Sequence, residues 1–233
     1  MILKKINIII QARLSSSRFP SKIFEHLWGQ RIIDRVVNEC LKVEKVDCVV
    51  LAIPKTEFEL SNYLRERFSN KIVIVEGSMT DVRSRFIDAI NLYPCEAFIR
   101  VCADNPLIQA SFLSELISTY YEGDYDYIYN DSRRSKGDEF IDGFGAELIK
   151  AEAFLERSKE QFDDLVKEHV TWGFSNDQRF KLCVPSWVTN NFRSELIVDI
   201  NTLEDLKVLN SIQEPNVGYS SHELLKYLHE HTG

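Results

Sequence analysis

The largest group of side chains that could bind an anion follows the first apolar run of the sequence. The segment from residue 11 to residue 22 reads QARLSSSRFPSK, and its cations and hydroxyls are Arg13, Ser15, Ser16, Ser17, Arg18 and Lys22. Pro20 disfavours a continuous helix, so we expect a loop whose backbone N–H groups and hydroxyls surround an anion that the cations neutralise. The alternative is a solvated basic loop, since the segment lacks the glycines of a P-loop.

Two aspartates stand where apolar segments end. Asp104 follows Ala97–Cys102, and Asp199 follows Leu196–Val198. Ligands of open α/β sheets bind outside the carboxyl ends of the strands, so both carboxylates are candidate metal ligands. Each also suits an ordinary role, because an aspartate before Asn-Pro is often a turn or cap residue and Asp199 could cap the helix that follows.

The cationic loop and the two carboxylates together provide what nucleotidyl transfer needs. Cations would bind the β- and γ-phosphates of a nucleotide, and the carboxylates would hold a Mg²⁺ ion that bridges phosphate oxygens. The combination is more specific than its parts, and it predicts a metal-dependent nucleotidyltransferase.

Alternating strands and helices must position these residues. Apolar, β-branched runs predict strands at residues 6–12, 46–53, 72–75 and 97–102. Segments of helical period predict helices at residues 32–43, 58–68, 82–92 and 112–121. This alternation is typical of an α/β fold, with a mainly parallel central sheet flanked by helices on both faces.

The pattern changes after another apolar run, Tyr125–Tyr129. The later segments predict strands at 146–149 and 195–200, and helices from 151, around 162–168, at 203–211 and at 222–231. We expect a single domain over residues 1–233, with a small insert at about 130–190 that recognises the acceptor. Capping-box spacing predicts helix starts at Thr56, Thr202 and Ser220.

Composition argues against several classes of partner. The sequence has 28 Lys and Arg against 36 Asp and Glu, a net charge of −8, so it offers no general basic surface for nucleic acid or an anionic membrane. The apolar run at 6–10 is too short to span a bilayer and leads into a charged loop, not a cleavage site. The 5 cysteines are an odd number and do not have the paired spacing of metal ligands. We therefore expect reduced thiols, as in a cytoplasmic protein.

Six blocks of the sequence resemble one known family. The blocks are Gln11–Lys22, Thr80–Phe86, Arg100–Ile108, Asp142–Glu147, Glu168–Thr171 and Val198–Leu206. In order, they are similar to the Q-A-R-x-G-S-x-R-x-P-x-K, D-V-L-x-R-F/Y, R-x-x-G-D-x-P-L-I, D-G-L-D-x-E, E-H-V-T and V-D-x-x-x-D-L patterns of the spore-coat polysaccharide (SpsF-type) cytidylyltransferases. These enzymes are relatives of the CMP-sialate and CMP-Kdo synthetases.

The resemblance implies a nucleotide-diphospho-sugar transferase fold, which is Rossmann-like and often dimeric, with CTP as co-substrate. It implies that the nucleotide is bound by Gln11, Ala12, Arg13, Ser15, Ser16, Ser17, Arg18, Lys22, Arg85 and Arg100. It further implies that Asp104 and Asp199 hold Mg²⁺. For Arg85 the alternative is an ion pair on a helix face.

The sequence departs from the family patterns at Ser15, Ala103 and Gly145. Ser15 and Ala103 replace glycines, and a side chain at position 15 limits the backbone conformations available beside the base. That departure bears on the choice of CTP over UTP. Gly145 stands where the family has a second acidic residue, which bears on the acceptor.

Three residues of the insert are candidates for contact with the acceptor. Asp142 and Glu147 are placed there by their position in the chain, and His169 could touch the acceptor or act as a base. The alternatives are turn or surface carboxylates for the two acids and a hydrogen-bonded structural role for the histidine.

The interpretation that follows is a cytoplasmic, homodimeric enzyme that transfers CMP from CTP to a sugar acid or sugar phosphate and releases pyrophosphate, in the synthesis of surface polysaccharide precursors. One alternative is a glycosyltransferase, which would need an Asp-x-Asp motif where a strand ends. The triplet Asp124-Tyr125-Asp126 instead precedes an apolar run. The other alternative is a non-catalytic nucleotide-binding module.

Overall fold

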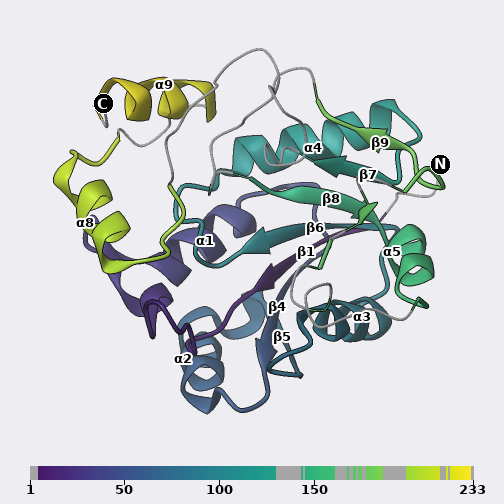
Figure 1. Ribbon diagram of the computed structural model, residues 1–233, viewed down its shortest axis with the longest axis horizontal. Helices are drawn as coiled ribbons and strands as arrows, with labels where there is room; N and C mark the ends of the chain where they lie inside the picture. The colour runs from purple at the N-terminus through teal and green to yellow at the C-terminus, as the bar shows by residue number, and fades with distance from the viewer. Residues whose placement is uncertain are drawn as a thin grey trace.

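A computed structural model describes residues 5–129, 143, 145–160, 167, 170–171, 173–174, 177–185, 198–215, 219 and 221–231. Its main sheet has 7 strands in the order β5-β4-β1-β6-β8-β7-β9 (Figure 1). These strands are β1 (Ile6–Gln11), β4 (Cys48–Pro54), β5 (Val73–Gly77), β6 (Ala97–Cys102), β7 (Tyr127–Tyr129), β8 (Glu147–Lys150) and β9 (Leu182–Cys183). A small hairpin is formed by β2 (His26–Leu27) and β3 (Gln30–Arg31).

Strand direction in the main sheet confirms the predicted mainly parallel fold. Strands β5, β4, β1 and β6 run parallel, whereas β8 is antiparallel to both β6 and β7. Gln11 at the end of β1 is paired with Ala52 of β4 and Cys102 of β6. The loops that follow these three strands therefore leave the sheet along one edge, where ligands of such sheets bind.

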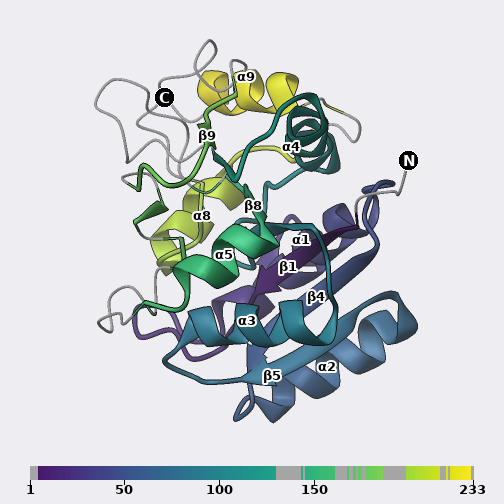
Figure 2. The same ribbon diagram turned by 90° about the vertical axis from the view of Figure 1, so that its right-hand side faces the viewer.

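Helices cover both faces of the sheet. They are α1 (Ile32–Leu41), α2 (Phe58–Phe68), α3 (Val82–Leu92), α4 (Ala110–Glu122), α5 (Ala151–Arg157), α8 (Leu203–Ser211) and α9 (Ser221–His231), with 3-10 turns η1 (Lys22–Phe24) and η2 (Ser69–Lys71). Along β1, Ile8 and Ile10 pack into one core with α1, α2 and α4, while Ile9 packs into a second core with α3 and α5. The period of two residues along a strand explains this division. In Figure 2, α3 and α5 lie in front of the strands.

The predicted elements agree closely with the structure where local period decides them. Helices α2, α3 and α8 have the predicted bounds, and Thr202 forms the predicted capping box with Asp205. The predicted start at Thr56 is wrong, because α2 begins at Phe58 and its N-cap is Glu57. The segment 198–200 is irregular instead of a strand, since the N–H of Ile200 donates to the carbonyl of Asp104.

Some predicted elements lie outside the described residues: most of the helix at 162–168, residues 195–197 of the predicted strand, and Ser220. Among the helices in the described part of the chain, none has the length and hydropathy needed to cross a membrane.

Candidate functional site

A cavity of about 290 Å³ opens at the carboxyl edge of the sheet. It is lined by Gln11, Ala12, Arg13, Ser16, Ser17, Arg18, Lys22, Ile23, Val82, Arg85, Arg100, Ala103 and Asp104. The structure thus gathers the predicted loop after β1, the predicted Asp104 and both predicted arginines around one space. Most of its charged lining is cationic, which suits an anion.

Strand pairing explains why the loop and Asp104 meet. Gln11 and Cys102 are paired at the ends of β1 and β6, and the N–H of Ala103 donates to the carbonyl of Gln11 at 3.0 Å. The chain after β6 therefore starts beside the loop after β1. The ammonium group of Lys22, which is only 7% exposed, lies 2.6 Å from Oδ2 of Asp104.

The segment that holds Asp199 is attached to the same edge. The N–H of Ile200 donates to the carbonyl oxygen of Asp104 at 3.0 Å. Asp199, the residue before Ile200, therefore lies close to the turn that contains Asp104. Asn201 bridges the segment to the loop, because its side-chain amide donates to Asp199 and its oxygen accepts from Nη2 of Arg18 at 2.6 Å. Three segments that are far apart in the sequence therefore meet here.

Gly143 packs against the backbone of Asp199. Its φ is +88°, and a Cβ at this position would lie 2.0 Å from the backbone nitrogen of Asp199. Any other residue would push the Asp199 segment away from the edge of the sheet, so only glycine permits this close approach.

Internal hydrogen bonds fix the shape of the cationic loop. The carbonyl of Leu14 accepts from the N–H groups of both Ser16 and Ser21, each at 2.8 Å. Ser21 has a φ of 57°, in the left-handed region, just before η1 places Lys22. This turn brings Lys22 back towards the start of the loop, where it faces Asp104.

Glu57 is a residue of the site that sequence reasoning missed. Its carboxylate accepts from the N–H groups of Leu14 and Ser15, at 2.7 and 2.9 Å, and from the hydroxyl of Ser15 at 2.7 Å. Ser15 is predicted to contact the nucleotide, but among the described residues it does not line the cavity, and that contact stays a prediction. Applying the strand-end rule to β4, as to β1 and β6, could have drawn attention to Glu57.

Arg85 lines the cavity, and among the residues that the structure describes it does not form the ion pair weighed as its alternative. The side chain is 2% exposed, and Nη1 donates to the carbonyls of Ala12 and Ala52, at 3.3 and 3.0 Å. Its Nε has no hydrogen-bond partner among the described residues. Burial, and then repulsion from Arg13, lowers the pKa of Arg85 to about 10. A buried cation without a carboxylate partner favours an anionic ligand.

Arg100 and Glu147 form an ion pair that reaches the cavity. Nη1 of Arg100 lies 2.5 Å from Oε2 of Glu147, and Nε donates to Oε1 of Gln11 at 3.0 Å. Burial alone would lower the pKa of Arg100, but the neighbouring Cys102 and the pairing with Glu147 together raise it above its ordinary value. Glu147 also accepts from the hydroxyls of Tyr127 and Thr171. Glu147 therefore orients Arg100, and its predicted contact with the acceptor stays a prediction.

The remaining candidates are placed as follows. Asp142 and His169 lie outside the described residues. Asp124 and Asp126 precede β7, where the carbonyl of Asp126 accepts from the N–H of Lys150, the residue paired with the first residue of β6. The Asp-x-Asp triplet is thus at the opposite edge of the sheet from Asp104, which speaks against the glycosyltransferase interpretation.

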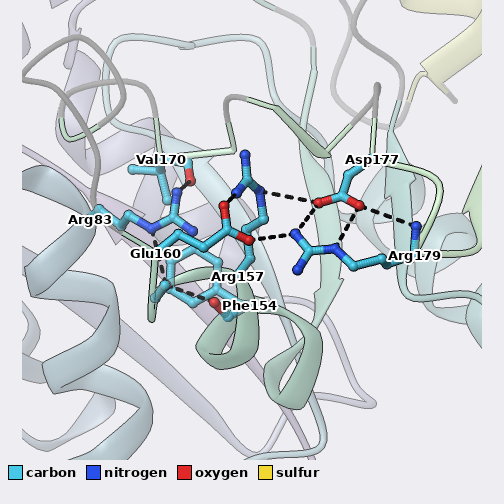
Figure 3. Close-up of polar contacts among 8 residues, drawn as sticks. Arg83, Phe154, Arg157, Glu160, Val170, Asp177 and Arg179 are labelled. Carbon is cyan, nitrogen blue, oxygen red and sulfur yellow. Dashed lines mark hydrogen bonds and ion pairs between the residues drawn. The ribbon is translucent and has the colours of Figure 1, made fainter.

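A second group of charges lies beside the sheet, away from the cavity lining (Figure 3). Arg157 and Arg179 both pair with Glu160 and with Asp177. A hydrogen bond from Arg179 is the main cause that lowers the pKa of Asp177 to about 2. These contacts fasten residues 177–179 to the end of α5.

Arg83 extends this group to α3. Its Nε donates to the hydroxyl of Ser158 at 3.0 Å and its Nη1 to the carbonyl of Val170 at 3.3 Å (Figure 3). The side chain is 3% exposed, and burial lowers its pKa to about 10. Because Thr171 binds Glu147, the segment at 170–171 is held between α3 and the ion pair of Arg100.

Comparison with known proteins gives a family match. A family model described as cytidylyltransferase matches residues 7–145. An uncharacterized protein of Methanocaldococcus jannaschii is 26% identical over 216 residues, which cover 90% of this chain and 84% of that protein. The spore coat polysaccharide biosynthesis protein SpsF of Bacillus subtilis is 27% identical over 172 residues, 71% of this chain and 68% of its own length.

Solved structures show the same fold. A cytidylyltransferase from Leptospira borgpetersenii superposes with a TM-score of 0.84 at 20% identity, covering 97% of this chain and 94% of that chain. A CMP:2-keto-3-deoxy-manno-octonic acid synthetase solved with CTP superposes with a TM-score of 0.65 at 13% identity, covering 89% and 97%.

Proposed function

Because the chain belongs to the cytidylyltransferase family and is a nucleotidyltransferase, we propose that it transfers CMP from CTP to a sugar acid or sugar phosphate and releases pyrophosphate. The observation that carries this proposal is the cavity at the carboxyl edge of the sheet. There, Arg13, Arg18, Lys22 and Arg85 surround a space that also contains the carboxylate of Asp104.

The charges of the cavity suit a triphosphate. Arg85 is a buried cation, and within the described part of the chain its guanidinium donates only to carbonyl groups. An entering anion could therefore pair with Arg85 without displacing a carboxylate. Lys22 and Arg18 line the same cavity, where they would receive the departing pyrophosphate. Preorganised cations of this kind stabilise charge that develops in the transition state.

The acceptor oxygen would attack the α-phosphorus of CTP in line with the leaving pyrophosphate. The protein would contribute mainly by positioning the two reactants and by neutralising charge. The side-chain oxygen of Gln11 is held by Arg100, which fixes the orientation of its amide at the cavity wall. Arg100 would thus act on the nucleotide side through Gln11 as well as directly.

Asp104 and Asp199 are the carboxylates that would hold Mg²⁺. Asp104 and Asp199 belong to segments joined by the bond from Ile200 to Asp104. Among the described residues, no group of three or more His, Cys, Asp or Glu could hold a metal, so phosphates and water would have to complete the coordination. That is the usual mode for Mg²⁺, which would supply positive charge to the reacting phosphate.

The names of the relatives support a sugar acid as the acceptor. Matches include 3-deoxy-manno-octulosonate cytidylyltransferases and an 8-amino-3,8-dideoxy-manno-octulosonate cytidylyltransferase. On this side Asp142, Glu147 and His169 remain the candidate contacts. We also place the enzyme in a reducing cytoplasm, in line with its free cysteines, and expect a homodimer by likeness to the family.

A screen for CTP-dependent pyrophosphate release tests the function. The purified chain is incubated with Mg²⁺, CTP or UTP, and a panel of sugar acids and sugar phosphates. The proposal expects release with CTP and at least one acceptor, and little with UTP. Consumption of a ready-made nucleotide sugar would support a glycosyltransferase, and CTP binding without turnover across the panel would support a binding module.

A further inference from the structure

The loop after β1 contains two adjacent N–H groups that point to the same carboxylate. The N–H groups of Leu14 and Ser15 both donate to Glu57, one to each carboxylate oxygen. Adjacent N–H groups that point the same way form a concavity suited to an anion. In this protein the anion in that concavity comes from its own chain.

The cavity lining shows the consequence for the loop. Arg13 and Ser16 line the cavity, whereas Leu14 and Ser15, which lie between them, are not among the described residues that do. The backbone therefore turns its middle residues towards Glu57 and its flanking residues towards the cavity. A ligand phosphate would have to bind to Ser16, Ser17 and the cations instead of the Leu14–Ser15 concavity.

Glu57 is itself held firmly. It is 9% exposed, follows β4, and its N–H donates to the carbonyl of Pro54 at 3.1 Å. It is also the N-cap residue of α2, and its carbonyl accepts from the N–H of Ser61 at 3.1 Å. The side chain thus extends from a fixed backbone to the Leu14–Ser15 turn, and the negative charge of Glu57 partly offsets the burial that lowers the pKa of Arg85.

From this geometry we propose that Glu57 is a positioning residue, which fixes the Leu14–Ser15 turn so that Arg13 on one side and Ser16–Arg18 on the other face the nucleotide cavity. That the cavity binds a nucleotide is part of the function proposed above, and this inference depends on it. The serine that replaces the family glycine takes part in this arrangement, because the Ser15 hydroxyl supplies a third bond to the same carboxylate.

Two readouts test the proposal separately. The first is amide hydrogen exchange of Leu14 and Ser15, without ligand, in the wild type, Glu57→Ala, Glu57→Gln and Glu59→Gln. Glu59 is an exposed carboxylate in the first turn of α2 and serves as the matched control. We expect exchange of both amides to be about tenfold faster in the two Glu57 variants and unchanged in Glu59→Gln.

The second readout is the Kd for CTP in the presence of Mg²⁺, measured by calorimetry. We expect Glu57→Ala to raise the Kd about tenfold, and Ser15→Ala, which loses only the hydroxyl bond, to raise it about threefold. In the Glu57→Ala background, Ser15→Ala should add little, since the carboxylate partner of the hydroxyl is already absent and only its weaker contact with Sδ of Met79 is left to lose. Thermal unfolding of each variant separates these effects from loss of the fold.

The outcomes are distinct. Unchanged exchange in both Glu57 variants would overturn the proposal, as would faster exchange with an unchanged Kd, or strictly additive effects of Ser15→Ala and Glu57→Ala. If the wild type fails to bind CTP, the proposed function falls, and the exchange rates alone then decide whether Glu57 orders the loop. If Glu57→Ala does not fold, Glu57→Gln and Ser15→Ala carry the same comparison.

Discussion

The N–H of Ile200 donates to the carbonyl oxygen of Asp104 at 3.0 Å. This bond fastens the segment before α8 to the turn after β6 and sets Asp199 beside Asp104. On the other side of the turn, Lys22 is ion-paired with Asp104, and Arg18 is bonded to Asn201. The cationic loop and both carboxylate segments are therefore held to one another before any ligand binds, as preorganised catalysis requires.

Replacing Asp104 tests the carboxylate. We expect Asp104→Asn to lower CTP-dependent pyrophosphate release at saturating Mg²⁺ by at least about 100-fold, since a neutral amide would hold Mg²⁺ less well than the carboxylate, and the ion would supply the positive charge at the reacting phosphate. Asp88→Asn, an exposed carboxylate on α3, is the control and should keep full activity. Near-normal turnover of Asp104→Asn would remove this residue from the mechanism.

Replacing Lys22 tests whether its ammonium group competes with a metal ion for the carboxylate of Asp104. The Lys22 ammonium lies 2.6 Å from Oδ2 of Asp104, the carboxylate that we propose as a Mg²⁺ ligand. We expect Lys22→Met to tighten binding of Mn²⁺ without nucleotide by about tenfold and to weaken binding of CTP. Electron paramagnetic resonance would count free Mn²⁺. Arg18→Met removes a loop cation without uncovering Asp104, so it should leave the Mn²⁺ affinity close to that of the wild type.

Arg85 should contribute to ligand binding and little or nothing to the stability of the fold. We expect Arg85→Met to weaken CTP binding while leaving the free energy of unfolding unchanged within about 1 kcal/mol, or raising it, because a buried cation without a carboxylate partner stabilises the fold little. Calorimetry with CTP and urea unfolding measure the two effects. A large loss of stability would show that Arg85 serves the fold.

The pH dependence of that comparison has a defined sign. Burial lowers the pKa of Arg85 to about 10 in the folded state, below its ordinary value. The folded protein therefore binds this proton more weakly than the unfolded chain, so charged Arg85 costs stability below pH 10, and the cost fades as pH rises through 10. The stability of the wild type relative to Arg85→Met should stay level up to about pH 9 and rise from there to about pH 11 in urea unfolding.

The Arg100–Glu147 pair should matter mostly for stability. The two side chains are 18% and 6% exposed, so Glu147→Gln leaves a largely buried guanidinium without its charge partner. We expect the free energy of unfolding to fall by about 3 kcal/mol, whereas Glu152→Gln, on the exposed side of α5, should change little. We expect Arg100→Gln to lower the free energy of unfolding by a similar amount. If the double variant loses no more than either single variant, the two residues act as a pair.

The elements of the fold could be read from the sequence because their signals are local. The apolar period of 82–92 and 203–211 alone gave the bounds of α3 and α8, and Thr202 with Asp205 marked a helix start. The order of strands and helices then required a mainly parallel sheet, and the strand-end rule placed Lys22 and Asp104 at one edge.

Other features depended on the tertiary structure. Thr56 has the spacing of a capping box, yet Glu57 takes the N-cap position and turns its carboxylate to Leu14 and Ser15. The alternative for Arg85 was an ion pair on a helix face, yet its guanidinium donates to the carbonyls of Ala12 and Ala52, which belong to the loop after β1 and to β4. Helical and strand periods repeat within a few residues, so the local sequence determines them. These contacts join residues on different elements, and they exist only once the strands have paired.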